Sequence, residues 1–426
     1  MNILLLGSGG REHAIAWKLS TSKKLKKLFI APGNAGTNNL GTNINLNTKK
    51  FSSIGSFILK EKINILIVGP ENIIVEGIYD YLKPKFPNLT IIAPSKKASL
   101  LEGSKRFAKE FMEKYKIPTA KYASFKKNQF KQAVNYLKSI KAPYVLKANG
   151  LAAGKGVVIL QNKLEAEKEL KEMLIDNKFG AASDEVLIEE FLSGIELSVF
   201  VLTNGIDYKI LPTAKDYKRI GEGDTGLNTG GMGSVSPVPF ANKAFMQKIE
   251  NLIIKPTIEG LKKENIKYYG FIFLGLIKVN NEPKVIEYNV RLGDPETQVV
   301  LPRIKSDLVN LFSKIEDKHA FKLEKLEISA KCCSTVILSS KGYPEKYTTG
   351  QSISGLNISE AQNIIFHAGT KKENNKIITN GGRVLAVSSL GKSIKQATQN
   401  SYKRIKAIHF DGVYYRKDIG LDLIPK

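Results

Sequence analysis

The chain has 426 residues, 42% of them hydrophobic, and its 65 basic and 40 acidic side chains give a formal net charge of +25. That length exceeds one compact core and predicts two to four globular domains. The two adjacent cysteines exclude a disulfide scaffold, no apolar run approaches the roughly 20 residues that span a bilayer, and the N-terminal residues do not form a signal peptide, so we expect a cytoplasmic protein.

The first hundred residues alternate apolar runs typical of buried strands with helical and loop segments. Strands are expected at residues 2–6, 27–31, 64–68 and 90–93, and a helix at 11–19. Repeated β-α-β patterns indicate a parallel sheet covered by helices. Ligands of such sheets bind beyond the carboxyl ends of the strands, where the loops at Gly7, Pro32 and Gly69 lie.

A basic amphipathic helix at 104–115, with Phe107, Phe111 and Tyr115 on one face, lies near the first domain boundary. Strands are then expected at 121–125, 144–148, 157–160, 185–192, 196–203 and 207–212, and helices at 129–140 and 164–176. Residues 217–237 contain six glycines and little apolar content. They are expected to form a long irregular loop, either a functional lid or a disordered segment.

The remaining pattern separates a helix and hairpin from a different C-terminal region. A helix is expected at 240–264, a hairpin-like strand pair at 269–279 and 284–290, and a helix at 306–315. From about residue 326 the pattern changes to short strands at 333–339, 364–368 and 384–388 and one helix at 394–408. This change predicts a separate small α+β domain.

The positive charge has two interpretations. One is a basic patch that binds nucleic acid. The other is a set of solvated lysines, some of which serve small anionic ligands. The lysines are dispersed along the whole chain, and aromatic residues do not interleave with arginines as they do on a base-stacking surface. We therefore favour small-molecule partners over nucleic acid.

The segment P-K-V-I-E-Y-N-V-R-L-G-D-P-E-T-Q-V, residues 283–299, is the most informative part of the chain. Glu287, Asn289 and Arg291 are spaced by two, so they share one face of an extended strand. A carboxylate and an amide oxygen suit a hard metal ion bound to phosphates, and a guanidinium suits a second anion. The alternative is a solvated strand face with an incidental ion pair.

A first glycine loop, Gly7-Ser8-Gly9-Gly10, follows a strand and precedes a helix, where backbone N–H groups can approach a phosphate. Glu12 occupies the third glycine position of a dinucleotide fingerprint, and no acidic partner stands about 20 residues further on. We therefore favour a loop that binds a phosphate of a ligand other than a dinucleotide. The alternative is a tight turn between strand and helix with no ligand.

A second glycine-rich turn, K-A-N-G-L-A-A-G-K-G-V at 147–157, lies between two strands and is not a Walker A sequence. It suits a β-turn-β phosphate clamp, with Lys147 beneath the phosphates and Lys155, Gly154 and Gly156 over them. The alternative is a surface hairpin. Downstream, a strand is expected to end at Glu189, Glu190, Phe191 and Leu192. The backbone at this strand end can bond to adenine, with Glu196 near a ribose. The alternative is an acidic pair without a binding role, since such pairs are common at strand ends.

Together these segments resemble the phosphoribosylamine–glycine ligase family, in the family's order and over almost the full length. The matching segments are G-S-G-G-R-E-H-A (7–14), P-G-N-A-G-T (32–37), V-G-P-E (68–71), the turn at 147–157, D-T-G-L-N-T-G-G-M-G (224–233), N-V-R-L-G-D-P-E-T-Q (289–298) and G-G-R-V-L (381–385).

The resemblance implies an α/β and α+β multidomain fold. The expected parts are a Rossmann-like N-terminal domain at 1–103, an ATP-grasp unit at 104–325 with a small lid subdomain at about 121–192, and a small α+β C-terminal domain at 326–426. It implies that ATP phosphorylates the carboxylate of glycine and that the amine of 5-phosphoribosylamine attacks the glycyl phosphate. The products are glycinamide ribonucleotide, ADP and phosphate, in purine biosynthesis. No nucleic acid and no membrane is involved, and a monomer is expected.

The resemblance also implies roles for individual residues. Glu287 and Asn289 would hold Mg²⁺ or Mn²⁺, and Arg291 would orient an anionic substrate group and stabilise the acyl phosphate. The expected nucleotide site comprises Lys105, Lys147, Gly154, Lys155, Gly156, Glu189, Glu190, Phe191, Leu192 and Glu196. The expected substrate site comprises Gly9, Gly10, Glu71, Arg291 and Asp294, with Asp216 and Lys218 as further catalytic residues.

The chain departs from the family pattern at three places. Asn149 stands where an acidic residue is usual. Histidine is usual around the D-Y-K-R segment at 216–219, where this chain has Lys215 and Tyr217, and N-I-I-V follows Glu71 in place of a proline-containing run. Three other functions remain alternatives: an ATP-grasp enzyme acting on another carboxylate, a dinucleotide-dependent oxidoreductase and a basic nucleic-acid-binding protein.

Overall fold

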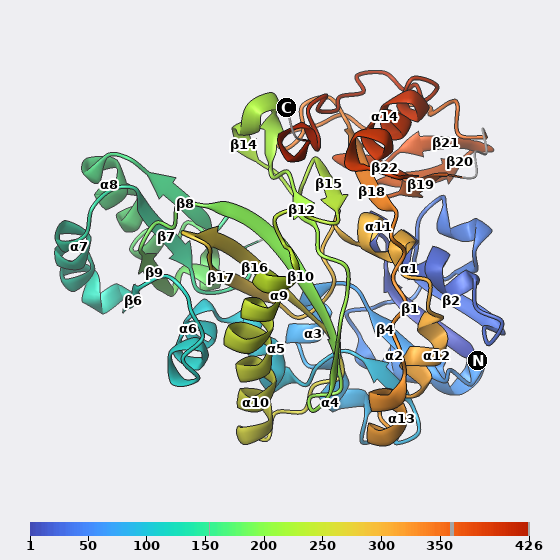
Figure 1. The fold of residues 1–426 in the computed structure, drawn as a ribbon, viewed down its shortest axis with the longest axis horizontal. Helices are drawn as coiled ribbons and strands as arrows, with labels where there is room; N and C mark the ends of the chain where they lie inside the picture. Colours follow the sequence, from blue (N-terminus) through green and yellow to red (C-terminus); the bar gives the residue numbers. More distant parts are fainter. Residues whose placement is uncertain (153, 358–361, 425–426) are drawn as a thin grey trace.

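The computed structural model describes residues 1–152, 154–357 and 362–424 (Figure 1). Its N-terminal part is the predicted parallel sheet, with strand order β3-β2-β1-β4-β5. The strands are β1 Asn2–Gly7, β2 Lys27–Pro32, β3 Thr42–Asn43, β4 Ile65–Val68 and β5 Thr90–Ile92, and the helices are α1 Gly10–Ser20, α2 Phe51–Glu61, α3 Glu71–Val75, α4 Ile78–Leu82 and α5 Lys96–Gly103. Because the strands are parallel, the loops after β1, β2 and β4 meet at one edge.

An antiparallel sheet with strand order β6-β9-β7-β8 forms a lobe that projects to the left in Figure 1. Its elements are β6 Tyr122–Lys126, α7 Phe130–Ser139, β7 Tyr144–Ala148, β8 Val157–Leu160, α8 Lys163–Leu174 and β9 Glu185–Glu189. Leu137 and Leu170 pack from the two helices onto Leu146 and Ile188 of the sheet. The predicted strand at 185–192 ends three residues early, so its last residues lie outside the sheet.

The neighbouring antiparallel sheet, with strand order β11-β10-β16-β17, carries the polar strand. Its strands are β10 Ile195–Thr203, β11 Tyr208–Ile210, β16 Gly270–Val279 and β17 Glu282–Asn289. The predicted hairpin is confirmed: β16 and β17 are joined by Asn280 and Asn281, both at positive φ (49° and 62°). Positive φ at both turn positions matches the twist of the flanking strands.

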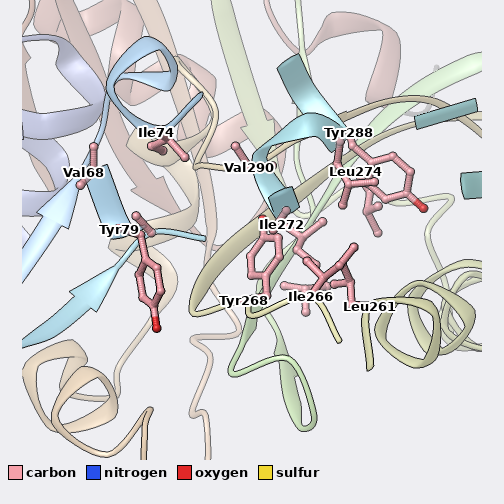
Figure 2. Close-up of a cluster of buried hydrophobic side chains, with 14 of the residues drawn as sticks. Val68, Ile74, Tyr79, Leu261, Ile266, Tyr268, Ile272, Leu274, Tyr288 and Val290 are labelled. Carbon is pink, nitrogen blue, oxygen red and sulfur yellow. The ribbon is translucent and has the colours of Figure 1, made fainter. Parts of the chain in front are cut away.

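A register shift in this hairpin sets which side chains face the core. The shift falls opposite Ile286, so Val285 and Tyr288, three residues apart, both pack in the core. Figure 2 shows Tyr288 and Val290 among the clustered apolar side chains. Glu287, Asn289 and Arg291 alternate with these two core residues and therefore share the opposite face, as the spacing predicts.

Helices cover the apolar face of that sheet. They are α6 Lys105–Lys114 and the continuous segment of α9 Lys243–Ile249, a π-helical turn Glu250–Ile254 and α10 Lys255–Lys263. Pro256 has no N–H for the helical ladder, and the π-helical turn lies immediately before α10. The rings of Phe111 and Tyr115 pack against each other on the predicted apolar face of α6, tilted by 48° with centroids 4.8 Å apart.

The C-terminal sheet has strand order β12-β15-β18-β22-β19 and combines two distant parts of the chain. Its elements are β12 Lys215–Asp216, β15 Gly233–Ser236, β18 Cys332–Ser339, β19 Asn363–His367, β22 Arg383–Gly391 and the covering helix α14 Ile394–Ile405, with the hairpin β20 Thr370–Glu373 and β21 Lys376–Thr379 beside it. The predicted strands and helix are confirmed, whereas β20 and β21 were not anticipated.

The prediction of an irregular loop at 217–237 is wrong. This segment forms the hairpin β13 Arg219–Gly221 and β14 Thr225–Asn228, and then β15. Arg416, 1% exposed, fixes the hairpin through ion pairs of 2.6 Å to both Asp224 and Asp418. Gly233 allows the backbones of two strands to approach closely, because a Cβ at this position would lie 2.8 Å from the carbonyl oxygen of Thr335 in the neighbouring strand.

Short helices link the central and C-terminal sheets: α11 Thr297–Val300, α12 Leu308–Ser313 and α13 Lys318–Leu323. No helix within the described ranges is long and apolar enough to cross a membrane. Cys332 and Cys333 are both free, as expected from their adjacency.

Candidate active site

The polar face of β17 carries two side chains, Glu287 and Asn289, that have no hydrogen-bond partner among the described residues. The carboxylate of Glu287 makes no hydrogen bond or ion pair with any described residue, and the side-chain amide of Asn289, 7% exposed, makes no hydrogen bond there through either its oxygen or its nitrogen. Burial by itself raises the pKa of Glu287, but the cations Lys218, Lys147, Lys105 and Arg291 around it hold that pKa below its usual value. An ionised carboxylate and an amide oxygen are therefore available to a ligand.

These two donors fit a divalent cation that takes its other ligands from phosphates. The described residues hold no cluster of three or more His, Cys, Asp or Glu side chains arranged for a metal. Mg²⁺ is commonly held by one or two protein oxygens with substrate phosphates completing its shell. The surrounding lysines supply the positive charge that such phosphates require.

Arg291 is held by two carboxylates from the N-terminal part of the chain. Its Nη2 lies 2.8 Å from Oε1 of Glu102, and its Nε lies 3.3 Å from Oε2 of Glu71. Glu102 also accepts the N–H of Val290 at 2.7 Å, which ties the end of β17 to α5. Arg11 approaches the same Glu71 oxygen at 3.9 Å. Glu71 thus supports Arg291, and this contact between distant segments orients the guanidinium.

The lysines expected at the nucleotide phosphates come from two elements. Lys105, at the start of α6, donates from Nζ to the carbonyl oxygen of Gly150 at 3.2 Å, and Lys147 on β7 lies 2.9 Å from Glu189. Burial lowers the pKa of Lys105, against the opposing effect of Glu287. The predicted strand-turn-strand is confirmed, with exposed Lys155 beside Gly154 at φ +75°. Ala153 of this turn lies outside the described residues.

Asn149 joins the glycine turn to α6. Its Oδ1 accepts the N–H of Arg106 at 2.9 Å, and its Nδ2 donates to Glu185 at 3.1 Å. The Asn149 carbonyl oxygen accepts the N–H of Lys105 at 3.0 Å. The side-chain and backbone carbonyl oxygens of Asn149 therefore satisfy one orphan N–H each at the helix start, and the backbone oxygen fixes the position of Lys105.

The edge expected to meet adenine lies immediately after β9. Glu190 and Lys121 form two hydrogen bonds. The Glu190 N–H donates to the Lys121 carbonyl oxygen at 2.9 Å, and the Lys121 N–H donates to the Glu190 carboxylate at 3.2 Å. The N–H groups of Phe191 and Leu192 have no partner among the described residues. Glu196, expected at the ribose, pairs with Lys218 at 2.6 Å.

A carboxyl cluster surrounds Lys218. Desolvation opposes the charge on Lys218, but the carboxylates of Glu196, Asp216 and Glu287 outweigh it and raise the pKa of Lys218 well above the usual value, and the Lys218 side chain remains 45% exposed. Asp216 on β12 has a raised pKa, chiefly from burial. Sequence reasoning missed Glu296, which accepts a hydrogen bond from Ser198 at 3.2 Å and whose pKa burial and Asp216 raise to about 7. Its signal was present in the quoted G-D-P-E-T-Q segment.

The first glycine loop contacts that same segment. Asp294 accepts the N–H of Arg11 at 3.3 Å and a bond from Gln298 at 2.8 Å, and a Cβ on Gly10 would lie 2.5 Å from the Gln298 amide nitrogen. The Gly9 N–H donates to Glu12 at 2.7 Å. The Glu12 carboxylate thus fills the end of the loop, which argues against a dinucleotide phosphate there.

Other contacts that sequence reasoning missed join the C-terminal sheet to this centre. Arg383 of β22 lies 3.4 Å from the Asp294 carboxylate and donates to the Asp294 carbonyl oxygen at 2.7 Å. The His367 N–H donates to His13 Nδ1 at 2.7 Å, so His13 has a structural role. The G-G-R-V-L segment contained the arginine, but no local pattern shows which loop it contacts.

Family models match nearly the whole chain. The N domain of phosphoribosylglycinamide synthetase matches residues 1–102, its ATP-grasp (A) domain matches 103–297 and its C domain matches 333–422. The dinucleotide-dependent and nucleic-acid-binding alternatives have no counterpart in these matches.

Curated proteins and solved structures agree. The phosphoribosylamine–glycine ligase of Fusobacterium nucleatum is 47% identical, covering 100% of this chain and 99% of the relative, and that of Caldanaerobacter subterraneus is 44% identical, covering 98% and 99%. The crystal structure of the Thermotoga maritima phosphoribosylamine–glycine ligase has a TM-score of 0.84 at 35% identity, covering 98% of this chain and 100% of that one.

A more distant similarity concerns the fold alone. The biotin carboxylase domain of Hydrogenobacter thermophilus 2-oxoglutarate carboxylase, solved with MgADP and bicarbonate, has a TM-score of 0.75 at 15% identity, covering 97% of this chain and 91% of that one. The multidomain α/β and α+β fold expected from the motifs is confirmed, and the chain belongs to the phosphoribosylamine–glycine ligase family.

Proposed function

We propose that this chain ligates glycine to 5-phosphoribosylamine with ATP, giving glycinamide ribonucleotide, ADP and phosphate. One observation carries the proposal: Glu287 and Asn289 lie on one strand face, neither side chain has a hydrogen-bond partner among the described residues, and the cations Lys105, Lys147 and Lys218 surround Glu287. Phosphoryl transfer to a carboxylate depends on charge neutralisation and alignment and needs no covalent nucleophile from the protein.

The nucleotide side of the site would use oxygen ligands for the metal and lysines for the phosphates. Glu287 and Asn289 would hold Mg²⁺ or Mn²⁺, which supplies neutralisation of the phosphate charge when bound. Lys105, Lys147 and Lys155, with the amides of Gly154 and Gly156, receive the nucleotide phosphates. The free N–H groups after β9 face adenine, in the segment that includes Glu189, Glu190, Phe191 and Leu192, and Glu196 meets the ribose.

The acceptor side lies around Arg291. Its guanidinium, held by Glu71 and Glu102, orients the glycine carboxylate for attack on the γ-phosphorus of ATP, with ADP leaving. The amine of phosphoribosylamine then attacks the carbonyl of the glycyl phosphate and releases phosphate and a proton. Asp216 and Lys218 are the further catalytic residues on the acceptor side. Gly9, Gly10 and Asp294 border the phosphoribosylamine.

The test measures ADP release with ATP, glycine and freshly generated 5-phosphoribosylamine, and then omits each component in turn. We expect release to require all three. Release that ignores glycine would overturn the assignment. Release supported by bicarbonate instead would favour a related enzyme that acts on another carboxylate.

Oligomeric state and localisation are the remaining properties of the proposed enzyme. We expect a monomeric cytoplasmic enzyme with small-molecule partners only. Light scattering after size-exclusion chromatography measures the mass of the particle, and a mass twice that of the 47.1 kDa chain would contradict the monomer.

A further inference from the structure

Behind the nucleotide lysines lies a buried cluster of three charged side chains. Glu189 accepts both Lys109 at 3.0 Å and Lys147 at 2.9 Å, and both contacts are made by the same oxygen, Oε2. The side chains of Lys109, Glu189 and Lys147 are 2%, 3% and 8% exposed. Glu189 Oε1 is buried and has no hydrogen-bond partner among the described residues.

Lys109 is fixed in place by contacts beyond the carboxylate. Its Nζ donates to Thr119 Oγ1 at 2.9 Å and to the Ala120 carbonyl oxygen at 3.2 Å, which satisfies its three N–H bonds together with Glu189. Its position on α6 is one turn beyond Lys105. Lys109 therefore ties α6 to the segment before β6 and to Glu189 at the end of β9.

The charges in this cluster sum to +1 with Lys109 present and to zero without it. A buried Glu189–Lys147 pair alone would neutralise itself, and Lys147 would be committed to the carboxylate instead of to a phosphate. Because Lys109 shares the same carboxylate oxygen, Lys147 keeps net positive charge for the nucleotide. We propose that Lys109 is a positioning residue that keeps Lys147 available to the phosphates of ATP.

The pKa of Lys109 gives an independent signature. Burial lowers it to about 8, against the opposing effect of Glu189. As pH rises through 8, the folded protein loses this charge. ATP affinity is therefore expected to weaken above pH 8, and arginine at this position, which stays protonated, removes that weakening.

This inference depends on the proposed function, and binding of ATP to the unmodified protein tests that function separately. The experiment measures the affinities for ATP with Mg²⁺ and for adenosine by calorimetry, in four variants. These are Lys109→Met, Lys109→Arg, the double variant Lys109→Met with Glu189→Gln, and the control Lys114→Met, whose side chain is 62% exposed on the same helix.

We expect Lys109→Met to weaken ATP binding at least about tenfold and adenosine binding less than about threefold, since only the phosphates sense the lost charge. The double variant restores a net charge of +1 and is expected to bind ATP more tightly than Lys109→Met does. Lys109→Arg is expected to bind ATP normally and to show no weakening above pH 8. The control is expected to match the unmodified protein.

Equal weakening for ATP and adenosine, or a double variant that binds ATP no better than Lys109→Met, would overturn the inference. If circular dichroism shows that Lys109→Met is unfolded, the pH dependence of ATP affinity in the unmodified protein is compared with that in Lys109→Arg. Identical pH profiles would refute the inference. Failure of the unmodified protein to bind ATP would instead defeat the proposed function.

Discussion

Glu287→Gln separates the proposed chemistry from the fold more cleanly than any other single change. The substitution keeps the shape of the side chain and removes its charge. Glu287 has no hydrogen-bond or ion-pair partner among the described residues, so the variant loses only the attraction of the surrounding cations, and we expect the free energy of unfolding to fall by about 1 kcal/mol or less.

Ligation is expected to fall steeply in the same variant. A divalent cation contributes several kcal/mol of charge stabilisation in phosphoryl transfer, and a loss of about 4 kcal/mol corresponds to roughly a thousandfold lower rate. In addition, the cations Lys105, Lys147 and Lys218 would lose the carboxylate that they surround. The nucleotide would then bind without a fixed position for its metal.

The assay is glycine-dependent ADP release, with the melting temperature measured on the same samples. Glu282→Gln is the matched control, because Glu282 lies on the same strand with its side chain 55% exposed and pairs with Lys248. We expect the control to keep full activity. Turnover retained in Glu287→Gln, or a loss of activity that is matched by unfolding, would refute the metal assignment.

Three further predictions concern contacts between distant segments. Glu102→Gln removes the carboxylate that Arg291 faces at 2.8 Å and is expected to raise the KM for glycine, since the guanidinium loses one of the two groups that orient it; an unchanged KM would contradict this role. Burial lowers the pKa of His13 to about 3 and that of His367 to about 4, so the unfolded chain binds protons that the folded chain refuses. Stability is therefore expected to fall as pH drops from 6.5 towards 4, with a flatter slope in His13→Gln; an unchanged slope would contradict this. Arg416→Met is expected to speed hydrogen exchange in the β13–β14 hairpin by mass spectrometry, and unchanged exchange there would show that its ion pairs do not hold the hairpin.

Local patterns were sufficient for most elements because their causes are local. Apolar runs between glycine turns gave the parallel strands, and alternation placed Glu287, Asn289 and Arg291 on one face. The glycine-rich turn after Lys147 joins two strands, as its composition indicates. These features depend on side-chain period and turn chemistry, which the sequence contains directly.

Residues 217–237 show where local reasoning failed. Glycines weaken intrinsic strand preference, so the segment was expected to be irregular. Its strand β15 forms because β18, about a hundred residues away, supplies the hydrogen bonds and leaves room only for glycine at position 233. Such an override of local propensity is typical of sheets built from distant segments.

The sequence by itself determined the chemical character of the site: the metal-type oxygens, the phosphate-type lysines and the order of the segments that carry them. Only the tertiary structure decided how these groups are held. The carboxylates on Arg291, the sharing of Glu189 between Lys109 and Lys147, and the approach of Arg383 to Asp294 all join residues far apart in the chain. Charge pairing of this kind depends on distance and burial in space, and neither quantity is encoded in the spacing of residues along the chain.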